Sequence, residues 1–174
     1  MLVAILRPAT RPKVSAGVIL IPPIPITGPR PPAQSPTANR FEIASPYTLA
    51  HSASTAKVAP TTVASGYGSL VTEATTARLT YTSPATAVVK LDYDVSIKQA
   101  SGADRDIVIA VHRNGSVIAG SEVIMTSVTG DAHQASGSCL YNASTNDYFE
   151  IYALNTGASG DMLFQKVGLT LTAT

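Results

Sequence analysis

The sequence predicts an all-β protein, namely an antiparallel sandwich of about eight strands, a count that fits a jelly roll, preceded by an extended proline-rich arm. Two observations predict the sandwich. Apolar and polar side chains alternate through much of the chain beyond residue 66, and turn signals separate the alternating runs. A third observation predicts the arm, because ten of the 12 prolines lie in the first 46 residues. We therefore divide the chain into an arm (residues 1–40), a transition segment (41–66) and a jelly-roll domain (67–174).

The arm combines prolines, apolar residues and an unbalanced charge. Seven of the fifteen residues from 22 to 36 are proline, which favours extended polyproline II or irregular backbone. The first 41 residues carry five basic and no acidic side chains, whereas the other 133 carry seven basic and eleven acidic ones. The arm is also too apolar for a solvated linker, so we expect it to bind a partner. The predicted contact residues are Arg7, Arg11, Lys13, Ile19, Ile21, Ile24, Ile26, Arg30 and Arg40.

The transition segment is rich in Ala, Ser and Thr, and Pro46 and Pro60 interrupt it. Two short apolar stretches stand out, Phe41–Ile43 and Tyr47–Leu49. Each is either a short strand or a contact with a neighbouring subunit, and the sequence leaves both alternatives open.

The jelly-roll domain begins its clearest alternation at Val89, where apolar residues at every second position to Ile97 predict a strand with one wet face. The same period recurs at 107–111. Asn114-Gly115 then predicts a two-residue hairpin turn, because both central residues of that turn need a positive φ. Residues 117–125 are expected to return as one strand.

Further strands are predicted on both sides of this hairpin. Gly130-Asp131 marks another turn, and the last strand is expected to be lined by Leu163, Val167, Leu169 and Leu171. The remaining predicted strands are Leu70–Val71, Arg78–Tyr81, Gln134–Tyr141 and Tyr148–Leu154.

The sequence offers little catalytic or metal-binding chemistry, so we expect a protein that is not an enzyme and uses no cofactor or metal. The single cysteine, Cys139, excludes an intrachain disulfide. His51, His112 and His133 stand in no metal-ligand spacing, and no Gly-x-Ser-x-Gly motif occurs. His112 lies opposite the apolar face of its strand, which predicts an exposed or interfacial side chain.

Nucleic acid and membrane are not expected partners. Five basic residues over 41 make a weak phosphate footprint, and Phe41 is the only aromatic residue near them. The longest apolar stretch of the arm is broken by Pro22, Pro23 and Pro25, so it is unlike a membrane span.

Three features follow one another along the predicted jelly-roll domain. They are the hairpin Val111–Ile118, the segment Asn146-Asp-Tyr-Phe-Glu-Ile-Tyr152 after a serine-rich strand, and the final segment Val167–Thr172. This order resembles the C-terminal jelly rolls of the tumour-necrosis-factor/C1q-like type in virion proteins of tailed bacteriophages, which include head fibres, capsid decoration proteins and tail fibres. The resemblance covers roughly residues 70–174. It implies a homotrimer packed about a threefold axis, without catalysis.

The resemblance and the arm together lead to our first hypothesis, a capsid decoration or cement protein on the outer surface of a virion, assembled in the host cytoplasm. The arm would bind the major capsid protein or another virion protein. The alternative is a head- or tail-fibre adhesin that binds host glycan, with Tyr141, Tyr148 and Tyr152 as candidate contacts. A third possibility is a free interaction module whose segments Pro22–Pro25 and Pro29–Pro32 are bound by a partner domain.

Overall fold

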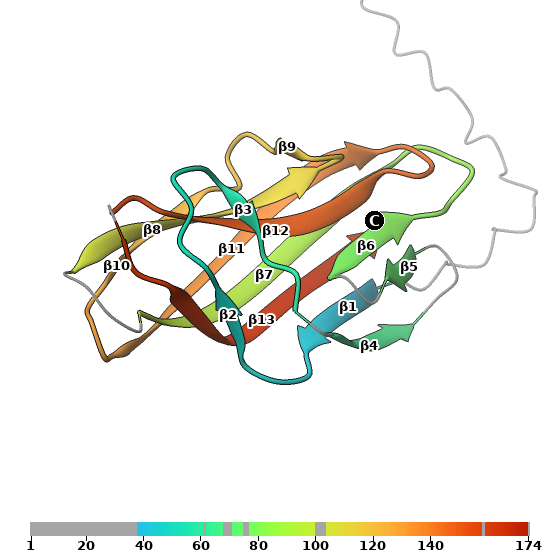
Figure 1. Cartoon of the computed structure of the whole chain (residues 1–174). Coiled ribbons are helices and arrows are strands. Elements are labelled where there is room, and N and C mark those ends of the chain that lie inside the picture. Colours follow the sequence, from blue (N-terminus) through green and yellow to red (C-terminus); the bar gives the residue numbers. More distant parts are fainter. Residues whose placement is uncertain are drawn as a thin grey trace, which may run out of the picture. The chain divides into compact units, whose positions relative to one another are not determined.

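A computed structural model describes residues 38–60, 62–67, 71–74, 77–99, 104–157 and 159–173, and of 62–67 and 71–74 it describes the backbone alone. All of them belong to one compact unit, residues 34–174. The described residues form thirteen strands in two facing sheets, and all pairs of strands are antiparallel (Figure 1). The prediction of an antiparallel all-β sandwich is confirmed.

Sheet A has the order β11-β7-β13-β1-β4, and the short β2 also pairs with β13. Its strands are β1 (Ala38–Ile43), β2 (Tyr47–Leu49), β4 (Thr62–Tyr67), β7 (Ala87–Gln99), β11 (Ala132–Ala143) and β13 (Met162–Ala173). Sheet B has the order β10-β8-β12-β6-β5, with β3 on β12 and β9 on β8. Its strands are β3 (Ala56–Lys57), β5 (Val71–Ala74), β6 (Arg78–Tyr81), β8 (Arg105–Arg113), β9 (Ser116–Val117), β10 (Val123–Ser127) and β12 (Tyr148–Asn155).

The core lies between the two sheets and follows the predicted alternation. The apolar face of β7 is buried at every second residue from Val89 to Ile97, and Ile107, Ile109 and Val111 of β8 face it from the other sheet. Larger side chains fill the middle. The aromatic ones that are buried are Phe41, Tyr81, Tyr93, Phe149 and Phe164. The burial of these side chains between the two sheets is the main contribution that holds the sheets together.

The hairpin after β8 is confirmed at its turn but not in its return. Asn114 and Gly115 both have positive φ, 50° and 82°, as the predicted turn requires. The returning strand is not continuous: β9 ends at Val117 and β10 starts at Val123. Between them the Ser121 hydroxyl accepts a hydrogen bond from the Val111 amide and donates one to the Val111 carbonyl, both at 3.1 Å. One side chain thus replaces the strand pairing that is missing there.

The last strand also departs from its predicted pattern. The register between β13 and β7 shifts between Phe164 and Lys166, so the side of the sheet that each residue faces changes there. As a result Phe164 is buried on the core side, whereas Leu163, which we predicted to line the core, is only half-buried. Beyond the shift, Val167, Leu169 and Leu171 are buried as predicted.

The sandwich begins earlier in the chain than the predicted domain boundaries. β1 lies between β13 and β4, and its Phe41, which pairs with Leu169, is completely buried. Residues 38–40, which we assigned to the arm, and the 41–66 segment, which we treated as a transition, therefore contribute strands to the two sheets. Both short stretches of that segment are strands, namely β1 and β2.

Tyr93 is a buried tyrosine that joins the two sheets. Its side chain is 2% exposed and its hydroxyl donates a 2.6 Å hydrogen bond to the Ser121 carbonyl oxygen. Burial raises the pKa of Tyr93 to about 12, and the nearby charges of Cys139 and Glu122 add to this. The folded protein therefore favours the neutral phenol.

We expect this tyrosine to make the fold sensitive to alkali. The stabilisation is complete below the unfolded pKa of about 10 and is lost as the pH rises towards about 12. Over that interval the free energy of unfolding should fall by up to about 1.4 kcal/mol per pH unit. Urea titrations from pH 9 to 12 on the wild type and on Tyr93→Phe would isolate the effect, because the variant lacks it. Parallel curves for the two proteins would show that Tyr93 is not responsible.

Candidate functional site

Eight of the nine arm residues predicted to contact a partner lie outside the described residues, and their role stays a prediction. The ninth, Arg40, is in β1 on the outer face of sheet A. Its Nη2 atom is 2.6 Å from Asp94 Oδ1 on β7, and its Nε atom is 2.7 Å from Glu42 Oε1. To reach Asp94 the guanidinium crosses β13 over Gly168, where a Cβ atom would lie 2.2 Å from Arg40 Nη2. The structure thus places Arg40 in an ion pair within the sandwich, not in the arm.

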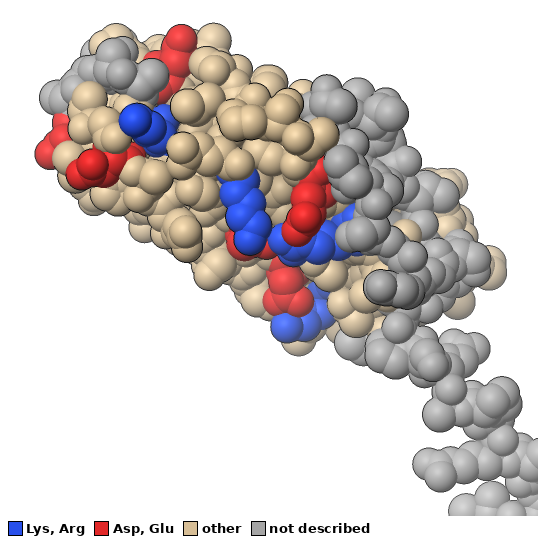
Figure 2. Space-filling model, turned by 90° about the horizontal axis from the view of Figure 1, so that it is seen from below, with Lys and Arg blue, Asp and Glu red and all other residues tan. Residues whose placement is uncertain are grey.

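Asp94 is the centre of a small charged group on this face. Lys166 Nζ lies 2.9 Å from its second oxygen. Burial by itself would raise the pKa of Asp94, but the hydrogen bonds from Lys166 and Arg40 outweigh burial and lower it. Beside the group, Gln134 and Ser136 of β11 complete a hollow of about 140 Å³. Figure 2, which views the molecule from below, shows charged side chains grouped near the middle of this face and at one end, with uncharged surface around them.

Strand β11 forms an open edge of sheet A, since it pairs with β7 on one side and with no strand of the described chain on the other. Its outward-facing residues are exposed, including Leu140 at 66%. Several of its inward-facing residues, such as Gly137 and Cys139, are only partly buried. Burial raises the pKa of the Cys139 thiol, so the thiol is not an activated nucleophile. Long open edges of this kind are normally covered in native proteins.

The three tyrosines predicted as glycan contacts do not form one surface. Tyr148 and Tyr152 lie on the outer face of sheet B, whereas Tyr141 of β11 faces the other sheet. Each ring has a face covered by the same chain. The covering groups are the Arg78 guanidinium at 3.8 Å from Tyr148, the His112 ring at 3.8 Å from Tyr152, and the Arg113 guanidinium at 5.2 Å from Tyr141. The use of these rings as sugar platforms stays a prediction.

His112 was predicted to be exposed or interfacial, and this is wrong for the isolated chain. The ring is 7% exposed because it stacks on Tyr152 with an angle of 13° between the two planes. Its Nδ1 atom is 3.1 Å from the Gly115 carbonyl oxygen in the adjoining turn. A polar position on the outer face of a strand is therefore buried by its cross-strand neighbour, which the pattern along one strand does not reveal.

Glu150 is a buried carboxylate on the outer face of sheet B, and the sequence analysis did not single it out. Its side chain is 2% exposed, and its Oε1 atom accepts hydrogen bonds from Lys57 Nζ at 2.5 Å and from Arg78 Nε at 2.7 Å. The two cations come from β3 and β6, which pair with β12 one after the other along the edge opposite β8. The carboxylate thus links β3, β6 and β12 through ion pairs. This structural role is enough to explain why a carboxylate is buried here, and no bound ligand is needed for the explanation.

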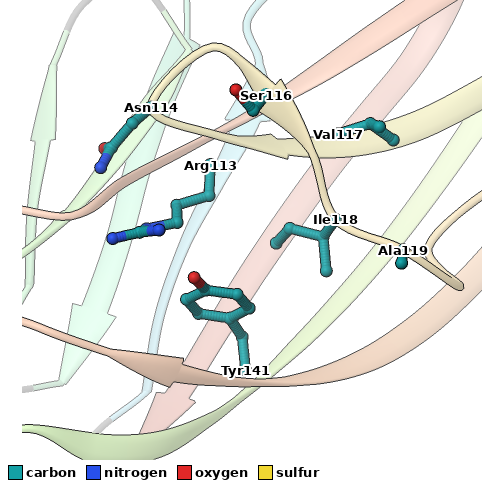
Figure 3. Close-up of a pocket in the computed structure, with 7 residues that line it drawn as sticks. All are labelled: Arg113, Asn114, Ser116, Val117, Ile118, Ala119 and Tyr141. Carbon is teal, nitrogen blue, oxygen red and sulfur yellow. The ribbon is translucent and has the colours of Figure 1, made fainter.

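A hollow of about 200 Å³ opens beside the Asn114-Gly115 turn. Its walls are drawn in Figure 3 and comprise Arg113, Asn114, Ser116, Val117, Ile118, Ala119 and Tyr141. The Arg113 side chain extends over the hydroxyl end of Tyr141, and Ile118 faces both from the far side of the hollow. The hollow is smaller than the roughly 300 Å³ at which pockets for drug-sized ligands begin. It can hold one side chain or one small polar group.

Arg113 joins this hollow to a buried carboxylate. Its Nη2 atom is 2.9 Å from Asp147 Oδ1, and Asp147 also accepts hydrogen bonds from Asn114 Nδ2 and the Ser144 amide. Burial by itself would raise the pKa of Asp147, but these three donors outweigh it and lower the pKa. The Nε atom of Arg113 is buried and makes no hydrogen bond. The Arg113 side chain is 37% exposed, so an incoming group could reach its exposed part but not the buried Nε atom.

The described part of the chain carries neither a cluster of metal-binding side chains nor a helix that could span a membrane. It contains no group of three or more His, Cys, Asp or Glu side chains that could hold a metal ion. It also contains no helix long and apolar enough to cross a membrane.

Comparison with known proteins identifies relatives by structure alone. No protein-family model and no curated protein sequence matches the chain. Among solved structures, murine APRIL at pH 5.0 superposes with a TM-score of 0.55 and 9% identity, over 80% of this chain and 100% of that chain. The fold is a TNF-like jelly roll. The Eiger TNF of S. frugiperda matches at 0.54 with 13% identity, over 80% and 94% of the two chains. The PRD1 vertex protein P5 matches at 0.53 with 11% identity, over 79% and 96%.

The jelly-roll part of the predicted resemblance is thereby confirmed, while an origin in a tailed phage stays a prediction. Identities of 9–13% establish a shared fold and carry no activity or binding partner from one protein to another. The sequence predicts the hairpin that borders the Arg113 hollow but not the hollow itself. The hollow depends on Arg113 of β8 and Tyr141 of β11, which belong to different sheets and meet only when the two sheets pack. The order of the hairpin and the strand at Tyr148–Tyr152 was the only signal in the sequence for this region.

Proposed function

We propose that this protein is a structural virion protein of the capsid decoration type, a homotrimer whose arm binds the major capsid protein or another protein of the phage shell. The main support is the contrast between arm and sandwich. Four basic and no acidic residues precede Ala38, whereas the chain from Ala38 onward carries eight basic and eleven acidic ones. An extended basic segment attached to a mildly acidic domain suits attachment to a large acidic surface. The likeness to a virion vertex protein adds support at the level of the fold.

Self-association is supported by the open edge at β11. A second copy that covered this edge would bury the exposed Leu140 and the partly exposed inward side chains beside it. A trimer is the state implied by the resemblance to tumour-necrosis-factor/C1q-like jelly rolls. Three arms per trimer would then bind with an avidity that no single arm needs to supply.

We expect a chain without residues 1–33 to keep its oligomeric state and to lose binding to the shell. This deletion leaves β1 intact, which matters because Phe41 is part of the core. Light scattering should give three times the mass of one chain for both forms, where the full-length chain is 18.0 kDa and the truncated chain is correspondingly lighter. Cosedimentation with expanded capsid shells of the virus that encodes the chain should fall by about 100-fold or more, because the avidity of three arms is removed.

A full-length variant with Arg7, Arg11, Lys13 and Arg30 changed to Gln is the matched control, since it keeps the length of the arm and removes its charge. Partial loss in this variant would assign part of the affinity to charge and the remainder to the apolar residues of the arm. Undiminished binding by the truncated chain would refute the anchoring role of the arm. A monomeric mass for both forms would refute the trimer.

The fibre or adhesin alternative has one observation in its favour, the hollow beside Tyr141. Two observations count against it. One face of each candidate tyrosine ring is covered, and Tyr141 does not share a surface with Tyr148 and Tyr152. The decoration protein is therefore the function that the arrangement supports best.

A further inference from the structure

β1, the first described strand, begins at one definite end of the sandwich. β1 begins at Ala38, which pairs with Thr172 near the end of β13 and with Tyr67 at the end of β4. β11 finishes at this end at Ala143 and β8 finishes there at Arg113 (right-hand side of Figure 1). We call it the arm end. The opposite end, the far end, carries the turn at Gly130 and the start of β8.

The Arg113 hollow opens at the arm end, because the Asn114-Gly115 turn follows directly after β8. Its apolar wall includes Val117, which is 49% exposed, and its polar wall includes the guanidinium of Arg113, whose side chain is 37% exposed. The centres of protein interfaces often contain both an apolar side chain that the partner covers and an arginine that donates hydrogen bonds to the partner. The site is therefore built for a small protruding group of another molecule.

The two ends of the sandwich differ in the number of exposed carboxylates, and this difference would favour one orientation on an acidic surface. At the arm end the carboxylate of Asp147 is buried and paired with Arg113, so it contributes little negative charge to the surface. At the far end Asp104, Asp131 and Asp161 are all exposed. Figure 2 shows acidic side chains at that end of the visible face (left), with basic atoms among them. A surface that attracts a basic arm would repel the far end.

We propose that the arm end is a second contact with the same partner protein that the arm binds, and that the Arg113 hollow receives a partner side chain with an oxygen acceptor. This inference rests on the proposed function. It adds that the sandwich stands on the shell by its arm end and points the acidic far end outward. Because both contacts belong to one polypeptide, binding of the arm raises the local concentration of the hollow at the shell. The second contact therefore increases the overall affinity even if it is weak by itself.

The test compares two valines of similar exposure. Val117→Asp places a carboxylate at the rim of the hollow, whereas Val128→Asp makes the same change at the far end, where Val128 is 39% exposed. Full-length proteins would be titrated against purified capsid shells of the encoding virus at fixed salt. We expect Val117→Asp to weaken binding by about tenfold or more through like-charge repulsion and lost apolar contact, and Val128→Asp to leave it unchanged.

Thermal unfolding and light-scattering mass would confirm that both variants fold and assemble as the wild type does. Should Val117→Asp fail to fold, Ser116→Glu at the neighbouring exposed position makes the same comparison. Equal affinities for the wild type and the hollow variant, with binding still lost on deletion of residues 1–33, would overturn the arm-end contact and leave the proposed function standing. Failure of the wild type to bind shells at all, or full binding without the arm, would instead overturn the proposed function.

Discussion

Replacing Glu150 by Gln should lower the free energy of unfolding by about 3 kcal/mol, which is near the lower limit for breaking a buried ion pair. The carboxylate is almost completely buried and is the shared partner of Lys57 and Arg78. Its removal leaves two cations side by side with no counter-charge. The expected loss is at the lower limit because Lys57 and Arg78 are 23% and 36% exposed and partly recover their hydration.

Glu42→Gln is the matched control, because Glu42 also pairs with an arginine but is 50% exposed. Its expected cost is within about 1 kcal/mol, as for other exposed pairs. Urea unfolding of both variants at one protein concentration would measure the difference, since the stability of an oligomer depends on concentration. Equal costs for the two variants would mean that the Glu150 cluster does not fasten β3, β6 and β12 together.

Replacing Gly137 by Ala should cost about 2–3 kcal/mol, the upper part of the range of about 1–3 kcal/mol for forcing a methyl group into a packed core. A Cβ atom at this position would lie 2.4 Å from the Tyr93 ring and from its hydroxyl. The ring has little freedom to move away, because it is buried and its hydroxyl is bonded to the Ser121 carbonyl. The substitution therefore strains the ring or breaks that hydrogen bond.

Ser138→Ala is the control for this prediction, since Ser138 is the exposed neighbour on the same strand and should change stability by less than about 0.5 kcal/mol. Thermal and urea unfolding of the two variants give the comparison. A double-mutant cycle with Tyr93→Leu tests the cause, because the cost of Gly137→Ala should largely disappear once the ring is absent. A cost that persists in that background would locate the strain elsewhere.

Some elements were predictable because their signals are local. The alternation from Val89 to Ile97 is a property of consecutive residues, and it predicts one buried and one wet face wherever the strand sits. The Asn114-Gly115 turn is equally local, since positive φ at two successive positions is a matter of backbone sterics. The antiparallel sandwich follows from several such strands joined by such turns, and the structure confirms it.

Other features depend on residues that are distant in the sequence. Phe41 is central because β1 pairs with β13, whose Leu169 lies more than a hundred residues away, so no pattern within residues 41–66 could reveal that the segment enters the core. The shift at Phe164 and Lys166 reverses a periodicity that a sequence extends unchanged. Arg40, which local composition assigned to the arm, is drawn into the sandwich by Asp94 on another strand.

The sequence by itself determined the composition of the arm, the strand-forming alternation and the turn chemistry, since these arise from each residue and its immediate neighbours. The tertiary structure alone decided which strand lies in the middle of a sheet and which polar groups are buried. It also decided where a hollow opens and at which end of the sandwich β1 begins. The physical reason is that side-chain burial and ion pairing are set by contacts across and between sheets, and these contacts exist only after the chain has folded.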